Sequence, residues 1–137
     1  MGVEFDFNGK VVLVTGGTRG VGRGIAERFA EAGATIAVCA RTRVDDLPSS
    51  WRFVAGDIRE TETAWATVDA VVEQLGDLDV LINNAGGAPP ADSTTAPGRL
   101  TDRIVSLNLL APIYCSQRAN HWMQLGSGGA IVNIGNA

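Results

Sequence analysis

The stretch VVLVTGGTRGVG, residues 11–22, constrains the fold of this chain more than any other. Its first four residues are apolar, which is typical of a strand buried on both faces, because a half-exposed strand alternates polar and apolar side chains. Glycines follow at 16, 17, 20 and 22, and Val21, Ile25 and Phe29 then recur at the spacing of a helix that Gly33 would end. The sequence therefore predicts a strand, a glycine turn and a helix in direct succession.

This succession suits a phosphate ligand. Glycines let the backbone turn tightly and come close to a ligand, and the first amides of a helix present unpaired donors to it. A pyrophosphate fits such a site. The spacing is TGxxxGxG rather than the strict dinucleotide fingerprint GxGxxG, because Ile25 stands where a third glycine would be needed. An ordinary tight turn is the alternative interpretation.

The rest of the chain alternates strands and helices. Strands are expected over residues 35–40, 51–55, 78–83 and 128–134, and helices over 61–75 and 100–123. Strand, helix and strand in this order form βαβ units with right-handed crossovers. The expected fold class is α/β, a Rossmann-like doubly wound parallel sheet with strand order 3-2-1-4-5 in a single domain, residues 1–137. The fifth strand is expected to be buried, with an open, apolar outer edge where the sheet is truncated.

Two motifs give the chain a resemblance to the short-chain dehydrogenase/reductase family. Residues 15–22, TGxxxGxG, look like that family's glycine motif, and Asn83-Asn84-Ala85-Gly86, which follows the fourth predicted strand, looks like its second motif. The resemblance runs from about residue 7 to residue 134. In the family, the second motif steadies the central sheet and contacts the adenosine ribose.

The resemblance implies that the chain binds a nicotinamide dinucleotide. The cofactor-binding residues that it implies are Gly16, Thr18, Arg19, Gly20, Val21, Gly22, Arg41, Asp57, Ile58, Asn84, Ala85 and Gly86. Asp57 is expected to contact the adenine, and Ile58 to pack on it. Capping of the following helix is the alternative role for Asp57.

The residues after the second predicted strand indicate which cofactor is preferred. In dinucleotide folds an acidic residue here accepts hydrogen bonds from the ribose, whereas an arginine accommodates a 2′-phosphate. Arg41 and Arg43 stand at this place, and the first carboxylate after the strand is Asp45. Arg19, in the glycine turn, lies where it could close on the same phosphate. We therefore expect NADP(H) to be preferred over NAD(H), with solvated surface arginines as the alternative.

Asn108 stands where the resemblance places the asparagine of the family's catalytic tetrad. Pro112, four residues later, has no amide hydrogen for the Asn108 carbonyl, so a continuing helix should bend there. In the family this carbonyl holds a water in a proton relay, and a simple kink is the alternative. Tyr114 and Arg118 mimic the family's YxxxK spacing but lie too early, and we interpret them as packing and surface residues. His121 is expected to be a surface side chain.

The resemblance stops where the remaining catalytic groups would stand. The family places a serine just past the fifth strand and a YxxxK pair further on, whereas this sequence has Gly135, Asn136 and Ala137 after that strand. Proton transfer needs a group of matched pKa within hydrogen-bond reach. The 137-residue chain alone is therefore expected to hold the adenosine and phosphate half of a cofactor without catalysis. We interpret it as part of a longer polypeptide, with a truncated product as the alternative.

Composition excludes several classes of protein. A hydrophobic content of 45% fits a globular domain, and no apolar run approaches the roughly 18 residues that span a bilayer. The first residues carry acids where a signal peptide carries bases, so a cytoplasmic protein is expected. A net charge of −4 argues against nucleic acid as a partner. Cys39 and Cys115 are expected to be buried free thiols, with no disulfide or metal site.

These observations lead to one main hypothesis. The chain is expected to be the cofactor-binding part of an NADP(H)-dependent oxidoreductase that interconverts an alcohol and a carbonyl compound. A non-catalytic NADP(H)-binding module or sensor is the first alternative, and a purely structural domain is the second. The expected partners are a small-molecule substrate and either a second copy of the chain or a missing C-terminal segment.

Overall fold

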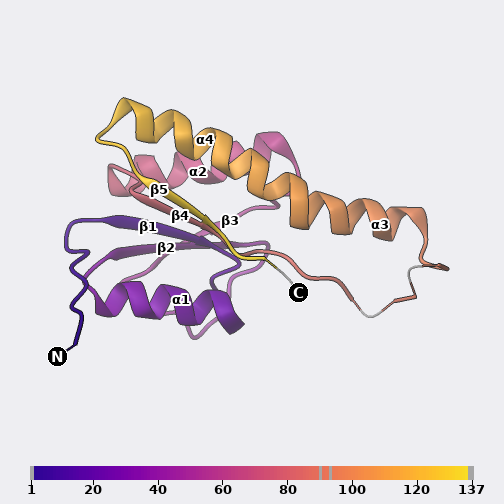
Figure 1. The fold of residues 1–137 in the computed structure, drawn as a ribbon, viewed down its shortest axis with the longest axis horizontal. Helices are drawn as coiled ribbons and strands as arrows, with labels where there is room; N and C mark the ends of the chain where they lie inside the picture. The colour runs from indigo at the N-terminus through magenta and orange to yellow at the C-terminus, as the bar shows by residue number, and fades with distance from the viewer. Residues whose placement is uncertain (1, 90, 93, 136–137) are drawn as a thin grey trace.

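The computed structural model describes residues 2–89, 91–92 and 94–135. Its sheet has five parallel strands in the order β3-β2-β1-β4-β5 (Figure 1). The strands are β1 (Val11–Thr15), β2 (Thr35–Ala40), β3 (Arg52–Ala55), β4 (Val80–Asn83) and β5 (Ala130–Asn133). This order confirms the predicted arrangement 3-2-1-4-5.

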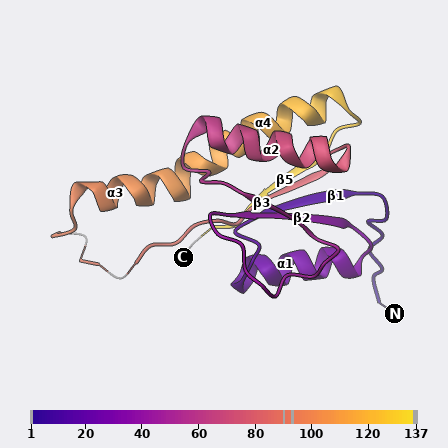
Figure 2. The ribbon, with the colours of Figure 1, turned by 180° about the vertical axis from the view of Figure 1, so that it is seen from behind.

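Helices cover both faces of the sheet. Helix α1 (Gly20–Glu31) lies on one face, and helices α2 (Thr61–Leu75) and α4 (Ala111–Leu125) lie on the other (Figures 1 and 2). Helix α3 (Gly98–Val105) leads through the π-helical turn η1 (Ser106–Leu110) into α4 and projects past the sheet (Figure 2). The fold is therefore the predicted Rossmann-like, doubly wound α/β arrangement.

The central strand β1 explains the two layers of the core. All five of its residues are buried, and successive side chains point to opposite faces of a sheet. Val12 packs with Ile25 in the core beneath α1. Leu13 packs with Val68 of α2 and Ala119 of α4 on the other face. A continuous apolar strand is what two covered faces require.

Strand β5 is largely exposed, so the prediction of a buried fifth strand is wrong. Its four residues are exposed or half-buried, and Val132 is 43% exposed. The reason is that β5 pairs with β4 alone and forms the edge of the sheet. β5 also begins at Ala130 rather than residue 128, and β3 and β4 begin at Arg52 and Val80, one and two residues after their predicted starts.

The predicted distortion before Pro112 takes the form of a π-helical turn. The amide of Ala111 donates to the carbonyl of Ser106, five residues earlier, instead of four. Pro112 then stands in the first positions of α4, where a missing amide hydrogen is tolerated. Such turns occur mostly as local insertions in α-helices, frequently at functional sites.

Arg118 joins α4 to α2 and is more than the surface residue predicted from the sequence. Its Nε donates to Asp69 Oδ1 at 2.6 Å, and Trp122 Nε1 donates to the same oxygen at 2.7 Å. The Arg118 guanidinium carbon lies 5.4 Å from the ring centroids of both Trp65 and Trp122. The residue is part of a helix–helix contact that the YxxxK-like spacing gave no reason to expect.

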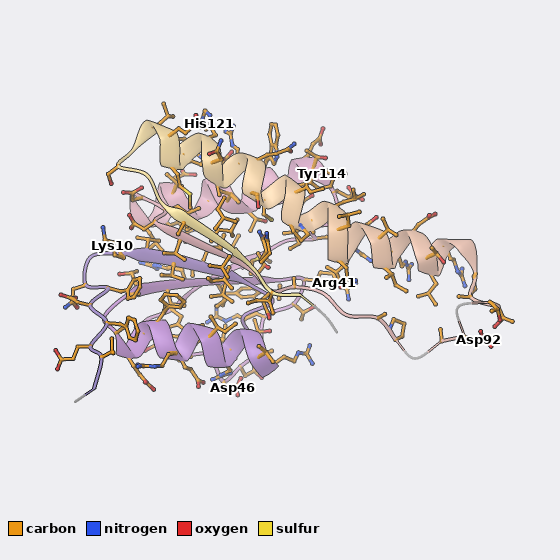
Figure 3. All side chains as sticks on the ribbon, viewed as in Figure 1. Lys10, Arg41, Asp46, Asp92, Tyr114 and His121 are labelled. Atoms are coloured by element: carbon orange, nitrogen blue, oxygen red, sulfur yellow. The ribbon has the colours of Figure 1, made fainter. Side chains whose placement is uncertain are left out.

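The neighbouring residues of α4 agree with their predictions. Tyr114 packs against the core that α2 and α4 share, and His121 is exposed, with its ring against Trp122 (Figure 3). Among the helices of the described residues, none combines the length and the hydropathy that a membrane-spanning segment needs.

Candidate functional site

A cavity of about 540 Å³ lies at the carboxyl ends of the strands. Its walls are the glycine turn after β1, the segments that follow β2, β3 and β4, and Leu107 of η1. Parallel strands end together at one edge of the sheet, and open α/β sheets bind their ligands at this edge. The lining includes the predicted residues Gly16, Thr18, Arg19, Arg41, Asp57, Ile58, Asn84, Ala85 and Gly86.

Gly20, Val21 and Gly22 lie outside this lining, in the first turn of α1. Val21 is 69% exposed and does not continue the apolar stripe of Ile25 and Phe29, which pack beneath the sheet. The helical spacing of these three side chains therefore predicted the helix correctly but gave Val21 the wrong environment. A single exposed apolar side chain is common on protein surfaces and does not by itself indicate a ligand contact.

Two glycines let the glycine turn and the second motif pack directly on each other. Gly16 has φ of +63°, in the left-handed region, and a Cβ there would lie 3.0 Å from Ala85 Cα. A Cβ on Gly22 would lie 2.5 Å from the Gly16 carbonyl oxygen and closer still to Asn84 Nδ2. Side chains at either position would push the two motifs apart and change the shape of the cavity.

Thr15 ties the same two motifs together through hydrogen bonds. Its Oγ1 accepts from the backbone amides of Asn84 and Ala85, both at 3.0 Å, and donates to the Ile82 carbonyl at 3.4 Å. Asn84 Nδ2 returns hydrogen bonds to the carbonyls of Thr15 and Gly16. In the sequence, Thr15 was only the first residue of the TGxxxGxG motif, and no contact was predicted for its side chain. The signal in the sequence was a hydroxyl side chain placed between an apolar strand and a glycine turn, where it can bind backbone groups of a neighbouring strand end.

The cavity has a basic character. Arg19, at the start of α1, and Arg41, after β2, both line it and are exposed (Figure 3 shows Arg41). Asp57 is the only carboxylate among the described lining residues, and Arg59 binds it with Nε at 2.8 Å and Nη2 at 2.5 Å. Hydrogen bonds from Arg59 hold the pKa of Asp57 below its usual value. The carboxylate is therefore ionised and already paired.

Asp57 does not have the helix-capping role that was its alternative. The residue at the N-cap of α2 is Glu60, and it makes no side-chain capping hydrogen bond. Asp57 instead accepts from the amide and side chain of Arg59. Arg59 was not among the predicted site residues. The only sign of its role in the sequence was an acidic residue, Asp57, two positions earlier.

A second cavity, of about 790 Å³, adjoins the first at Ala85. It is lined by Asn108 and Leu109 of η1, by Gly87 of the segment after β4, and by Asn133 of β5. The Asn108 side chain contacts Gly87 twice and also donates to the Ile104 carbonyl at 2.9 Å. The predicted catalytic residue thus lies beside the predicted cofactor residues, in a separate but adjacent space.

The described residues contain no group of three or more His, Cys, Asp and Glu side chains that could hold a metal ion. Cys39 and Cys115 are free and buried, as predicted. Burial raises the pKa of each thiol to about 12, so both are protonated at neutral pH.

A Rossmann-like sheet with a glycine turn at its carboxyl edge is typical of nucleotide-binding α/β proteins. Residues 10–137 match the sequence profile of the family described as short chain dehydrogenase. The chain belongs to the short-chain dehydrogenase family.

Individual relatives support this assignment. L-fucose dehydrogenase of Bos taurus is 35% identical over 137 residues, which cover 93% of this chain and 49% of that protein. A Sinorhizobium meliloti 1021 structure assigned as a short-chain alcohol dehydrogenase is 40% identical, with a TM-score of 0.87, over 96% of this chain and 56% of the other. An NADH-dependent reductase solved with NAD is 26% identical, with a TM-score of 0.87, over 95% of this chain and 61% of the reductase chain. The chain spans about half the length of the relatives it matches.

Proposed function

We propose that this chain is the cofactor-binding part of an NADP(H)-dependent oxidoreductase that interconverts an alcohol and a carbonyl compound. The observation that carries the proposal is that Arg19 and Arg41 line the same cavity. Asp57 is the only carboxylate among the described lining residues, and it is already bound by Arg59. Two guanidinium groups without a competing free carboxylate suit a phosphate.

The residues present fit a dinucleotide. Gly16 lines the cavity without a side chain between its backbone and a ligand, and α1 begins four residues later at Gly20. Backbone amides at a helix N-terminus bind phosphate oxygens well. We assign the pyrophosphate to this turn, the adenine to the region of Asp57 and Ile58, and the adenosine ribose to Asn84, Ala85 and Gly86. When bound, the nicotinamide ring supplies or accepts the hydride.

The preference for NADP(H) rests on the two arginines. The reductase solved with NAD is a relative of similar fold and supports a dinucleotide of this type, but not the choice between the two. A hydrogen bond to a charged group contributes about 1.5–3 kcal/mol, which is roughly 10- to 100-fold in affinity. Because Arg19 and Arg41 are both exposed, we expect the lower end of this range for the 2′-phosphate.

Asn108 is the catalytic residue that we propose within this chain. It lies in a π-helical turn, where the backbone is wider than in an α-helix, and it lines the cavity next to the cofactor site. That second cavity is where we place a small alcohol or carbonyl substrate. We further assign the protein to the cytoplasm, since two buried free thiols suit a reducing compartment.

Isothermal titration calorimetry of the full-length protein with NADPH and with NADH tests the proposal. We expect both to bind, with a dissociation constant for NADPH lower by about tenfold. Binding of neither at micromolar concentration would favour a purely structural domain. Tighter binding of NADH would contradict the role of the two arginines but leave the dinucleotide site in place.

A further inference from the structure

Arg23 connects three separate segments next to the proposed cofactor site. It lies on α1, and its Nη1 donates to the Thr18 carbonyl at 3.3 Å and to Asp46 Oδ1 at 3.0 Å. Nη2 donates to the Asp46 carbonyl at 2.7 Å, and Nε donates to Glu27 Oε1 at 3.1 Å. One guanidinium therefore holds the glycine turn, the helix and the loop between β2 and β3.

The surroundings of this guanidinium are partly buried. The Arg23 side chain is 21% exposed, and its Cζ lies 6.0 Å from the ring centroid of Trp51, which is itself buried. A single surface ion pair is worth little. Here the hydrogen bonds to two main-chain carbonyls use the planar, forked shape of the group, which a point charge does not reproduce.

The segments that Arg23 joins are those that carry the two arginines of the cavity. Thr18 directly precedes Arg19, and Asp46 lies on the loop that starts at Arg41. Figure 3 shows Arg41 at the carboxyl end of the strands and Asp46 on the α1 side of the sheet. Arg23 is absent from the described lining of the cavity, so it acts through its neighbours.

We propose that Arg23 is a positioning residue that fixes the spacing between Arg19 and Arg41 and thereby strengthens selection of the 2′-phosphate. This inference rests on the proposed function. A phosphate that two guanidinium groups bind together is sensitive to the distance between them, because each hydrogen bond weakens steeply with poor geometry. A loop released from Arg23 would leave Arg41 charged but badly placed.

A competing explanation is a simple effect of charge. Loss of the Arg23 cation would leave Asp46 and Glu27 unpaired near the phosphate and would weaken its binding without any movement. Arg23→Lys separates the two explanations. The lysine keeps the charge, but one ammonium group lacks the fork that reaches Thr18 and Asp46 together.

The test is the affinity of the full-length protein for NADPH and NADH, measured by calorimetry for Arg23→Lys and Arg23→Gln. Arg28→Gln is the matched control, since Arg28 lies on the same helix in an exposed pair with Glu31 at 3.4 Å. We expect both Arg23 variants to lower the affinity for NADPH by about fivefold or more, while the affinity for NADH changes by less than about twofold. Unchanged NADH binding also reports that the variants are folded.

Three results would overturn the inference. NADPH affinity retained in Arg23→Lys but lost in Arg23→Gln would show that charge alone acts. Equal weakening of both cofactors would show a general structural role. A similar loss in Arg28→Gln would show that position on the helix does not matter. Each of these leaves the proposed function standing, whereas a wild-type protein without preference for NADPH overturns that function itself.

Discussion

Asn108 and Gly87 are joined by a pair of hydrogen bonds between a side chain and a backbone. Asn108 Oδ1 accepts from the Gly87 amide at 2.8 Å, and Asn108 Nδ2 donates to the Gly87 carbonyl at 2.9 Å. The two residues are 21 positions apart, and the contact links η1 to the segment that follows the NNAG turn. The side chain of the proposed catalytic residue thus holds the backbone of another residue that lines the second cavity.

Asn108→Ala should loosen this segment. Loss of both hydrogen bonds frees the Gly87 backbone, so hydrogen exchange at the Gly87 amide should become faster by about tenfold, which corresponds to about 1.4 kcal/mol of local stability. Nuclear magnetic resonance of the exchange reaction measures this directly. Leu109→Ala, at an exposed neighbouring position, is the control. Unchanged exchange at Gly87 would show that other contacts hold the segment.

Thr15→Val should destabilise the protein although the two side chains have nearly the same shape. The change removes the oxygen that accepts from the amides of Asn84 and Ala85, and an unsatisfied buried polar group costs about 1–3 kcal/mol. Urea unfolding of the full-length protein measures the loss. Thr15→Ser, which keeps the hydroxyl, should recover most of it. Equal stability of the valine and serine variants would show that the Thr15 hydroxyl does not stabilise the contact between the ends of β1 and β4.

Asp69 should contribute stability that depends on pH. Burial alone raises the pKa of this carboxyl, but hydrogen bonds from Arg118 and Trp122 outweigh burial and hold the pKa below its usual value. A carboxyl with a depressed folded-state pKa stabilises the protein above its unfolded pKa, about 3.9, and this stability disappears as pH falls through the folded value.

The comparison of wild type with Asp69→Asn at pH 7 and at pH 3 tests this sign. The difference in free energy of unfolding should be up to about 1 kcal/mol at pH 7, because the pair is partly exposed, and should shrink at pH 3. Glu31→Gln removes the same charge from an exposed pair and serves as the control. A difference that grows toward pH 3 would contradict the assignment.

Cys39 and Cys115 should be unreactive in the folded protein. Burial raises the pKa of both thiols to about 12, and the thiolate is the reactive form. A thiol reagent such as Ellman's reagent at pH 8 should therefore modify neither cysteine within minutes, and both after unfolding in guanidinium chloride. Rapid modification of the native protein would show that the sheet opens readily near these residues.

The sequence predicted the sheet well because its signals are local. Each buried strand is a short apolar run, and the glycines of residues 16–22 stand directly after the first one. The spatial order 3-2-1-4-5 was predicted from the order typical of doubly wound α/β folds. The helix 61–75 was predicted with its observed ends, since Gly76 adopts the left-handed conformation that ends helices. The prediction that the fifth strand is buried was wrong, because its exposure depends on the elements that pack around it and not on its own apolar residues.

The candidate site was less predictable because much of it depends on partners distant in the chain. Thr15 contacts Asn84 and Ala85, and Arg23 contacts Asp46, across separations that no spacing rule gives. Arg59 differs, because its partner Asp57 lies only two residues earlier, a contact that we did not predict. The interpretation of Arg118 as a surface residue missed its contact with Asp69, because that partner lies 49 positions earlier. The π-helical turn was foreseen only as a distortion before Pro112, because proline removes a donor but does not determine how a helix accommodates the loss.

The role of Arg41 in selecting NADPH can be measured as the ratio of the NADH and NADPH dissociation constants, determined by calorimetry before and after Arg41→Asp. We expect the affinity for NADPH to fall by more than about tenfold, while the affinity for NADH changes little or rises. The reason is that aspartate repels a phosphate and accepts hydrogen bonds from a ribose hydroxyl. Arg43→Asp, the same charge change at a residue over the Phe53 ring, should have a much smaller effect. An equal loss of affinity for both cofactors in Arg41→Asp would contradict the assignment of Arg41 to the 2′-phosphate.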